Sequence, residues 1–155
     1  PCIAPSLNMT FATNRMKGLK EGLAAHSITM RPECVLTGDL TEKGGYERTC
    51  ELLSLAERPT AIVACNDLMA IGAIRAIQDA GLTVGRDISV TGFDDIPISE
   101  YVQPSLTTVS QPIYQIGRSA CEMLVDLLNE EAVDRKQILL EPTLMVRHST
   151  GIPIL

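Results

Sequence analysis

The feature that most constrains the fold of this chain is its alternation of short apolar runs with segments of helical periodicity. Strand-like runs occupy 2–4, 33–37, 60–65 and 88–93. The segments that follow place apolar residues at three- and four-residue steps, which is typical of amphipathic helices; they are 12–25, 42–56, 67–80 and 112–129, the last preceding a final strand near 138–147. Because strands joined by helices pair in parallel through right-handed crossovers, the sequence predicts an α/β fold with a parallel, Rossmann-like sheet flanked by helices.

Composition narrows the class of protein. The 155 residues carry a formal charge of −6 without a cluster of Lys and Arg, so this chain does not present a nucleic-acid surface of its own. Its five cysteines are irregularly spaced and include no CxxC, which indicates a reducing compartment and neither a disulfide framework nor a zinc site. No apolar run approaches the length of a membrane span, and we expect no membrane partner. The chain opens "PCIAPSL", as if cut within a strand, and we expect a fragment of a longer protein.

Polar residues follow three of the predicted strands. Asp39 follows the second strand, Asn66-Asp67 the third and Asp94-Asp95 the fourth. Ligands of open parallel sheets bind beyond the carboxyl ends of the strands, so we expect these groups to converge on one rim, with Arg15 of the first helix reaching it. Taken singly, Asn66 is also a good helix N-cap, Asp94-Asp95 a good turn and Arg15 an ordinary solvated residue. Together they suit a polyhydroxylated ligand such as a sugar, and equally a purine.

A catalytic function finds little support in the sequence. The two histidines, His26 and His148, lie beside no plausible nucleophile or orienting group. No GxSxG, P-loop, HExxH or GxGxxG pattern occurs. The paired carboxylates of "TGFDD" lack a further ligand run for a metal. We therefore predict a non-enzyme that uses neither a metal nor a cofactor.

The helix predicted over 67–80 has two faces with different character. A broad apolar side contains Met69, Ala70, Ala73, Ile74, Ile77 and Ala80. Leu68 and Ile71 fall on the other side, beside Gly72, Arg75 and Asp79. Two interpretations remain open: scattered surface hydrophobes, which need no explanation, or a contact face for a second subunit that Gly72 lets approach closely.

The chain resembles the lactose/galactose-repressor (LacI/GalR) family of bacterial transcription regulators. The motifs are "AIVACNDLMAIGAIRAIQDAGLTVGRDISVTGFDD", "PSLTTVSQP" and "IGRSACEMLVDLL", and the likeness runs from Arg15 to Thr150. In that family a helix-turn-helix domain precedes a regulatory domain of the periplasmic-binding-protein type I, whose two α/β lobes close around an effector. The resemblance implies that 1–110 and 138–150 form most of the second lobe, that the helix in 112–130 packs on the first lobe, and that the helix-turn-helix domain is absent.

The same resemblance assigns individual residues. It implies that Arg15 of "NRMKG", Asn66 of "ND" and Asp94 after "GF" contact the effector. Leu40 stands where relatives often place an aromatic that stacks on the ligand, and Met9 and Phe11 occupy loop positions that face the cleft. A subunit interface is implied on the helix after "ND" and around Tyr101. The residues expected there are Leu68, Ile71, Arg75 and Tyr101.

The implied function is the effector-binding and dimerisation lobe of a cytoplasmic regulator, usually a repressor. A sugar effector is favoured over a purine or nucleoside, the partner is a second copy of the chain, and operator DNA is contacted only through the missing amino-terminal domain. The alternative is half of a periplasmic sugar-binding protein of a transport system. Without the first lobe, the helix over 112–129 is expected to fold back locally, to swap between chains or to remain exposed.

Overall fold

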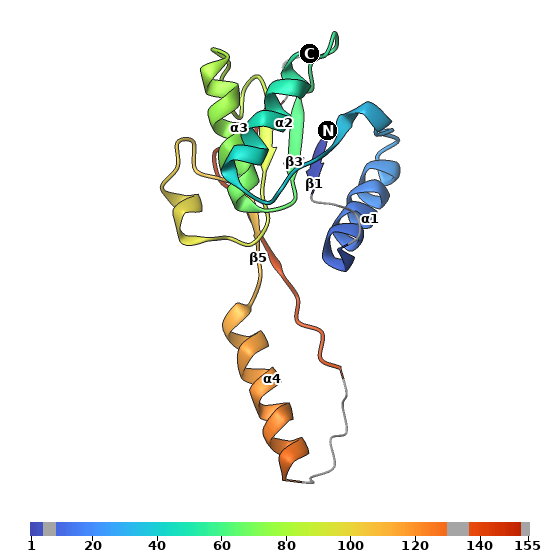
Figure 1. Cartoon of the computed structure of the whole chain (residues 1–155), viewed down its shortest axis with the longest axis vertical. Coiled ribbons are helices and arrows are strands. Elements are labelled where there is room, and N and C mark those ends of the chain that lie inside the picture. Colours follow the sequence, from blue (N-terminus) through green and yellow to red (C-terminus); the bar gives the residue numbers. More distant parts are fainter. Residues whose placement is uncertain (5–8, 130–136, 153–155) are drawn as a thin grey trace.

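The centre of the structure is a four-stranded parallel sheet. The computed structural model describes residues 1–4, 9–129 and 137–152. The strands, in the spatial order β2-β1-β3-β4, are β1 (Cys2–Ala4), β2 (Val35–Thr37), β3 (Ala61–Ala64) and β4 (Ser89–Thr91). Helix α1 (Thr10–Ala25) covers one face, and α2 (Glu42–Leu53) and α3 (Asp67–Asp79) cover the other (Figure 1). The predicted α/β fold with a parallel sheet is confirmed.

Each predicted strand and helix forms, with boundaries that differ for local reasons. The second strand begins at Val35, because the residues Pro32–Cys34 form a 3₁₀ turn (η1). The second helix ends at Leu53 rather than at 56, where the hydroxyl of Ser54 bonds the carbonyl of Glu51 and competes with the helical ladder. Helix α3 ends at Asp79, one residue before its predicted end, and Gly81 lies in the left-handed region at φ 76° as expected for the end of a helix.

Apolar side chains from both layers meet on the sheet. Ile3, Ile62 and Val90 of the strands are buried together with Met69 and Ile77 of α3. Aliphatic residues supply nearly all of this core, as the scarcity of aromatics requires. One residue of the predicted apolar side, Ala80, is exposed, because it is the C-cap residue and lies beyond the last turn of α3.

Helices α2 and α3 pack with their backbones in contact. A Cβ atom added at Gly45 would overlap the backbone of Met69, and one added at Gly72 would overlap the carbonyl of Glu42. The close approach that Gly72 permits is therefore to α2 of the same chain, and the expectation that it serves a second subunit is wrong. Glycine is required here for its size, since helices this close leave no room for a side chain.

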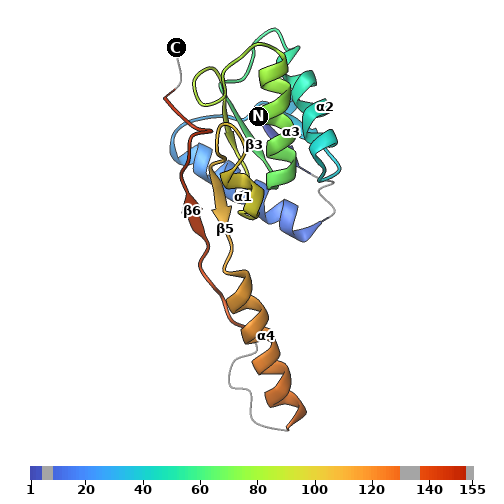
Figure 2. The same ribbon diagram turned by 90° about the vertical axis from the view of Figure 1, so that its left-hand side faces the viewer.

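A two-stranded ribbon leaves the sheet and carries the last helix. β5 (Thr108–Ser110) pairs antiparallel with β6 (Thr143–Met145), and α4 (Ile113–Leu128) projects from the end of the ribbon, away from the sheet (Figures 1 and 2). A short 3₁₀ helix, η2 (Pro97–Glu100), lies between β4 and β5. The helix predicted over 112–129 thus forms, and none of its described residues is buried within this one chain.

We predict that Gly72→Ala destabilises the protein by about 1–3 kcal/mol, because α2 and α3 must move apart to admit the methyl group. Gly18→Ala is the matched control: Gly18 lies inside α1 with open space around its Cβ position, so alanine there should stabilise by about 0.5–1 kcal/mol. Urea unfolding of both variants measures the difference. A Gly72→Ala protein as stable as Gly18→Ala would contradict the packing described here.

Candidate ligand-binding site

Two of the predicted site residues meet at the carboxyl end of the sheet. Arg15 Nη2 lies 3.1 Å from Asp94 Oδ1, and Arg15 Nη1 donates to the carbonyl of Cys65, which directly follows β3, at 2.5 Å. Both side chains are only partly exposed, 22% for Arg15 and 31% for Asp94. The expected convergence on one rim therefore holds for this pair. It arises because α1 and the loop after β4 both reach the same strand ends.

Aromatic rings hold the Arg15 guanidinium. Its Cζ atom lies 3.6 Å from the centroid of the Phe93 ring and 5.2 Å from that of Phe11. A guanidinium between ring faces gains cation–π attraction and loses freedom of movement. The sequence analysis included Phe11 and missed Phe93, although an aromatic directly before Asp94 in "GFDD" was the available signal.

The Asp94 carboxylate is held in a strained turn. Asp94 has φ 116° and Asp95 has φ 54°, conformations that cost a residue other than glycine about 1–3 kcal/mol and cluster at functional sites. The Asp94 N–H donates to the carbonyl of Val109 at 3.0 Å, and Gln111 Nε2 donates to Asp94 Oδ1 at 2.9 Å. Burial raises the pKa of the Asp94 carboxyl above its ordinary value, although Arg15 acts in the opposite direction. Gln111 is a second residue that sequence reasoning missed.

Asn66 has the structural role that its position predicted. Its Oδ1 accepts the N–H of Met69 at 3.0 Å and so caps α3, while its Nδ2 donates to the carbonyl of Leu40 at 3.0 Å. Leu40 is half-buried and has a left-handed backbone at φ 67°. Asn66 therefore connects the loop after β2 with the start of α3.

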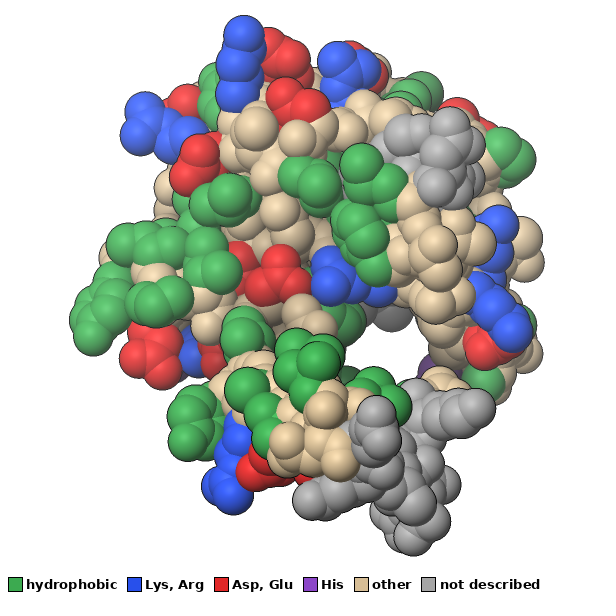
Figure 3. Space-filling view, turned by 60° about the horizontal axis from the view of Figure 1, so that its bottom comes forward, with side chains coloured by type: hydrophobic (Ala, Val, Ile, Leu, Met, Phe, Trp, Pro, Cys, Tyr) green, Lys and Arg blue, Asp and Glu red, His purple; other side chains and the backbone are tan. Residues whose placement is uncertain are grey.

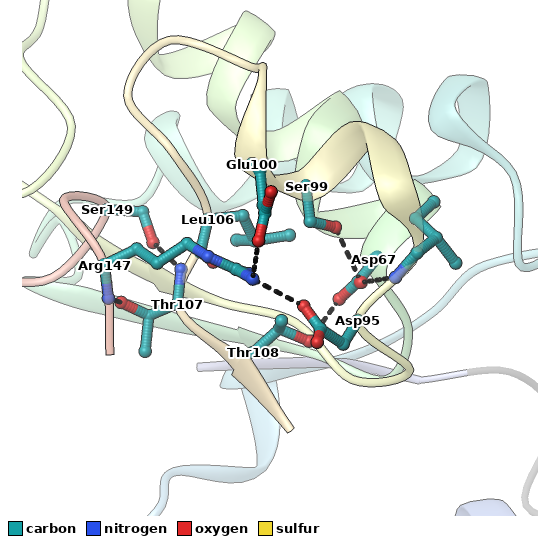
Figure 4. Close-up of polar contacts among 10 residues, drawn as sticks. Asp67, Asp95, Ser99, Glu100, Leu106, Thr107, Thr108, Arg147 and Ser149 are labelled. Atoms are coloured by element: carbon teal, nitrogen blue, oxygen red, sulfur yellow. Dashed lines mark hydrogen bonds and ion pairs between the residues drawn. The ribbon is translucent and has the colours of Figure 1, made fainter. Parts of the chain in front are cut away.

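The other predicted residues lie around the pair. Met9 and Phe11, at the start of α1, are 43% and 40% exposed. Asp39 accepts the N–H and hydroxyl of Thr41 at 3.1 and 2.6 Å and thus stabilises the start of α2. Asp67, expected at the rim beside Asn66, is instead fully buried, because donors from the loop after β4 and from β5 surround it (Figure 4).

A cavity of about 320 Å³ opens beside Arg15, between α1, the sheet and the ribbon. It is lined mainly by apolar side chains, among them Ala12, Met16, Val63, Val109 and Leu144. Burial raises the pKa of the Cys2 thiol to about 11 and also raises that of Cys65, so both cysteines that line the cavity are neutral near pH 7.

On the face turned toward α4, acidic and basic side chains lie next to each other among hydrophobic ones (Figure 3).

The residues assigned to a subunit interface lie on α3 and directly after η2. Tyr101, which caps η2, is 74% exposed, while Leu68 and Ile71 are half-buried. Arg75 is exposed and forms an ion pair with Asp79 at 2.8 Å. Gln78 of α3 donates to the carbonyl of Gln103 at 2.6 Å, so α3 and the segment after η2 form one continuous surface. Ile98 of η2 is 49% exposed and was not singled out from the sequence.

The chain matches a known protein family along nearly its whole length. The family model of the periplasmic binding protein-like domain matches residues 2–150. This chain belongs to that family. The ribose operon repressor of Haemophilus influenzae is 34% identical over 147 residues, 95% of this chain and 44% of the relative. The transcriptional repressor PurR of Haemophilus influenzae is 37% identical over 150 residues, 95% of this chain and 45% of the relative.

Solved structures show the same likeness. A LacI-family regulatory protein from Chloroflexus aggregans superposes with a TM-score of 0.91 at 37% identity, over 97% of this chain and 54% of that one. A dimeric Lac repressor gives 0.90 at 35% identity, over 99% and 55%. The complex of the regulator CelR with cellobiose gives 0.89 at 34%, over 96% and 45%.

These comparisons confirm the resemblance to the LacI family and the type I binding-protein fold. The relatives are transcriptional repressors, which supports the predicted non-enzyme and favours a regulator over half of a transport protein. The chain spans about half the length of the curated relatives it matches. Within the described ranges, no helix is long and apolar enough to cross a bilayer. The described His, Cys, Asp and Glu residues form no group that could hold a metal ion.

The raised pKa of Asp94 generates a prediction about stability. An acid that binds its proton more tightly in the folded state loses stability as the pH rises through the ordinary pKa toward the raised one. Asp94→Asn removes this titration but also leaves Arg15 without its partner, so we expect the melting temperature of the variant, relative to wild type, to show a gain between pH 4 and pH 7 rather than a fixed offset. Thermal melts of ligand-free protein across this range measure it. A gain that is independent of pH would contradict burial as the cause.

Proposed function

We propose that this chain is most of the ligand-binding and dimerising lobe of a cytoplasmic bacterial transcription regulator, usually a repressor, whose operator affinity is changed by a small effector. The observation that carries the proposal is the Arg15–Asp94 pair at the carboxyl end of a parallel sheet, where Arg15 also bonds the carbonyl of Cys65, the residue before Asn66. Residues 1–110 and 138–150 form this lobe, and the helix in 112–130 packs on a first lobe. Operator DNA is contacted through an amino-terminal domain that is not part of this chain.

The charge balance of the site supports a neutral ligand. Arg15 and Asp94 neutralise each other at 3.1 Å, so an ionic ligand would leave an unpaired charge in a partly buried place. Guanidinium and amide N–H groups donate, and carboxylate oxygens accept, which matches the hydroxyls of a sugar. We favour a sugar over a purine or nucleoside, and the cellobiose complex of CelR supports this class. The exposed ring of Phe11 offers a stacking face in place of the aliphatic Leu40.

The first prediction concerns the melting temperature of the intact protein, that is, the full-length regulator of which this chain is proposed to be a part. D-ribose, cellobiose and hypoxanthine serve as probes, and we expect a sugar to raise the melting temperature. Asn66→Ala and Asp94→Ala should reduce that shift by most of its value, because each removes a polar group that the ligand would pair with. Glu21→Ala, at an exposed ion pair on α1, is the control and should leave the shift unchanged. A full shift in both site variants would exclude this site.

A dimer through α3 and the segment after η2 is the second part of the proposal. The exposed or half-buried apolar side chains Leu68, Ile71 and Tyr101 share this surface with Arg75. The similar structure of a dimeric Lac repressor supports a dimer of this kind.

Ile71→Asp should therefore weaken self-association. Burying one aliphatic side chain contributes about 1.5–3 kcal/mol, and a symmetric dimer loses two of them, so we expect the dissociation constant to rise at least about 100-fold. Sedimentation of the intact protein measures this constant. Ile28→Asp is the control, since Ile28 is an exposed isoleucine in the turn after α1, away from this surface, and aspartate there should not change self-association. Equal effects of the two substitutions would refute the interface.

A further inference from the structure

The turn that carries Asp94 raises the question of what keeps it in place. Asp94 and Asp95 both have positive φ, and neither is a glycine. A strained conformation of this kind persists only where surrounding contacts determine it. The contacts of this turn therefore decide where the Asp94 carboxylate points.

Arg147, two residues after β6, makes the main contact with Asp95. Its Nη2 lies 2.8 Å from Asp95 Oδ1 and 3.3 Å from Glu100 Oε1, and its Nη1 donates to the carbonyl of Leu106 at 2.9 Å (Figure 4). Only 12% of the Arg147 side chain and 18% of the Asp95 side chain are exposed. The guanidinium is thus enclosed by two carboxylates and a carbonyl, with little access for water.

The backbone of Arg147 is fixed as well. Its N–H donates to Thr107 Oγ1 at 2.9 Å. The Thr107 N–H in turn donates to Ser149 Oγ at 2.8 Å (Figure 4). The Ser149 hydroxyl donates to the carbonyl of Val90 in β4. The position of Arg147 is therefore determined by β4 and by the segment that precedes β5, which makes it a rigid point from which to hold Asp95.

The remaining contacts of the turn come from two directions. On the ribbon side, Asp94 is bonded through its N–H to Val109 and through its carboxylate to Gln111. On the α3 side, Ile96, the residue after Asp95, donates its N–H to the carboxylate of the buried Asp67 at 2.9 Å. Asp95 lies between these two sets of contacts, and Arg147 is the partner of its side chain.

We propose that Arg147 is a positioning residue of the ligand site: through Asp95 it holds the turn so that the Asp94 carboxylate meets Arg15. This inference rests on the proposed function only for the identity of the site. Without the guanidinium, the Asp95 carboxylate, only 18% exposed, loses its ion-pair partner and has the carboxylate of Glu100 nearby, which favours opening of the turn. Arg147 does not contact the ligand; its effect on binding passes through the orientation of Asp94.

The first test needs no ligand. Hydrogen exchange of the intact protein is followed in peptides that cover 92–97. We expect Arg147→Met to accelerate exchange there at least about 10-fold, because the hydrogen bonds of Asp94 and Ile96 open more often, while peptides in α3 and β3 are unchanged. Arg147→Lys, which keeps the charge, should restore part of the protection. Arg86→Met removes an exposed arginine at the opposite end of the sheet and is the control.

The second test asks whether the effect passes through Asp95. With whichever of D-ribose, cellobiose or hypoxanthine stabilises the intact protein, Arg147→Met and Asp95→Asn should each raise Kd at least about 10-fold, and the double variant should be no weaker than either single one. If the rises in Kd of the two single variants multiply in the double variant, Arg147 does not act through Asp95. If none of these probes binds the wild-type protein, the proposed effector classes fail, while hydrogen exchange still decides the role of Arg147.

Two further outcomes overturn the inference. One is exchange over 92–97 that is the same in Arg147→Met and Arg86→Met. The other is faster exchange throughout the sheet in Arg147→Met, Arg147→Lys and Asp95→Asn alike, which would assign Arg147 to general stability. If Arg147→Met alone fails to fold, Arg147→Lys and Asp95→Asn give the same comparison.

Discussion

The ion pair between Arg15 and Asp94 joins two segments that lie 79 residues apart in the chain. Arg15 comes from α1, on one face of the sheet, and Asp94 from the loop after β4. Their contact lies at the end of β3, where Arg15 also bonds the carbonyl of Cys65. Because each charge is partly withdrawn from water, each depends on the other, and the contacts of Phe93, Gln111 and Arg147 serve to keep the two in register.

Structural and ligand-binding roles coincide in several of these residues. Asn66 caps α3 and ties it to the loop after β2, and it is also one of the proposed ligand contacts. Asp67 turns inward and accepts hydrogen bonds from Ile96 and Ser99 of the segment after β4 and from Thr108 of β5. A site built in this way is rigid before the ligand arrives, so little ordering entropy is lost on binding. The cost is the strain at Asp94 and Asp95.

Hydrophobic periodicity and the geometry of parallel sheets were enough to predict the helices and one contact of the site. Helical steps located α1 to α4, and the rule that strand ends share an edge brought Arg15 and Asp94 together. Contacts without a periodic pattern were missed: Arg147 reaches Asp95 across 52 residues, and Gly72 faces α2 rather than a second subunit. Asp67 was placed at the rim, because its adjacency to Asn66 did not reveal the buried donors around it. The sequence alone could not place α4, because its packing depends on contacts beyond its own apolar stripe.

The central claim is that a neutral ligand binds between Arg15, Asn66 and Asp94. A crystal structure of the intact protein, soaked with the sugar or purine that stabilises it, tests this claim most directly. We predict ligand hydroxyl or amide atoms within about 3 Å of the Arg15 guanidinium, the Asp94 carboxylate and the Asn66 amide. A ligand bound at another surface, with the Arg15–Asp94 pair untouched, would contradict the assignment.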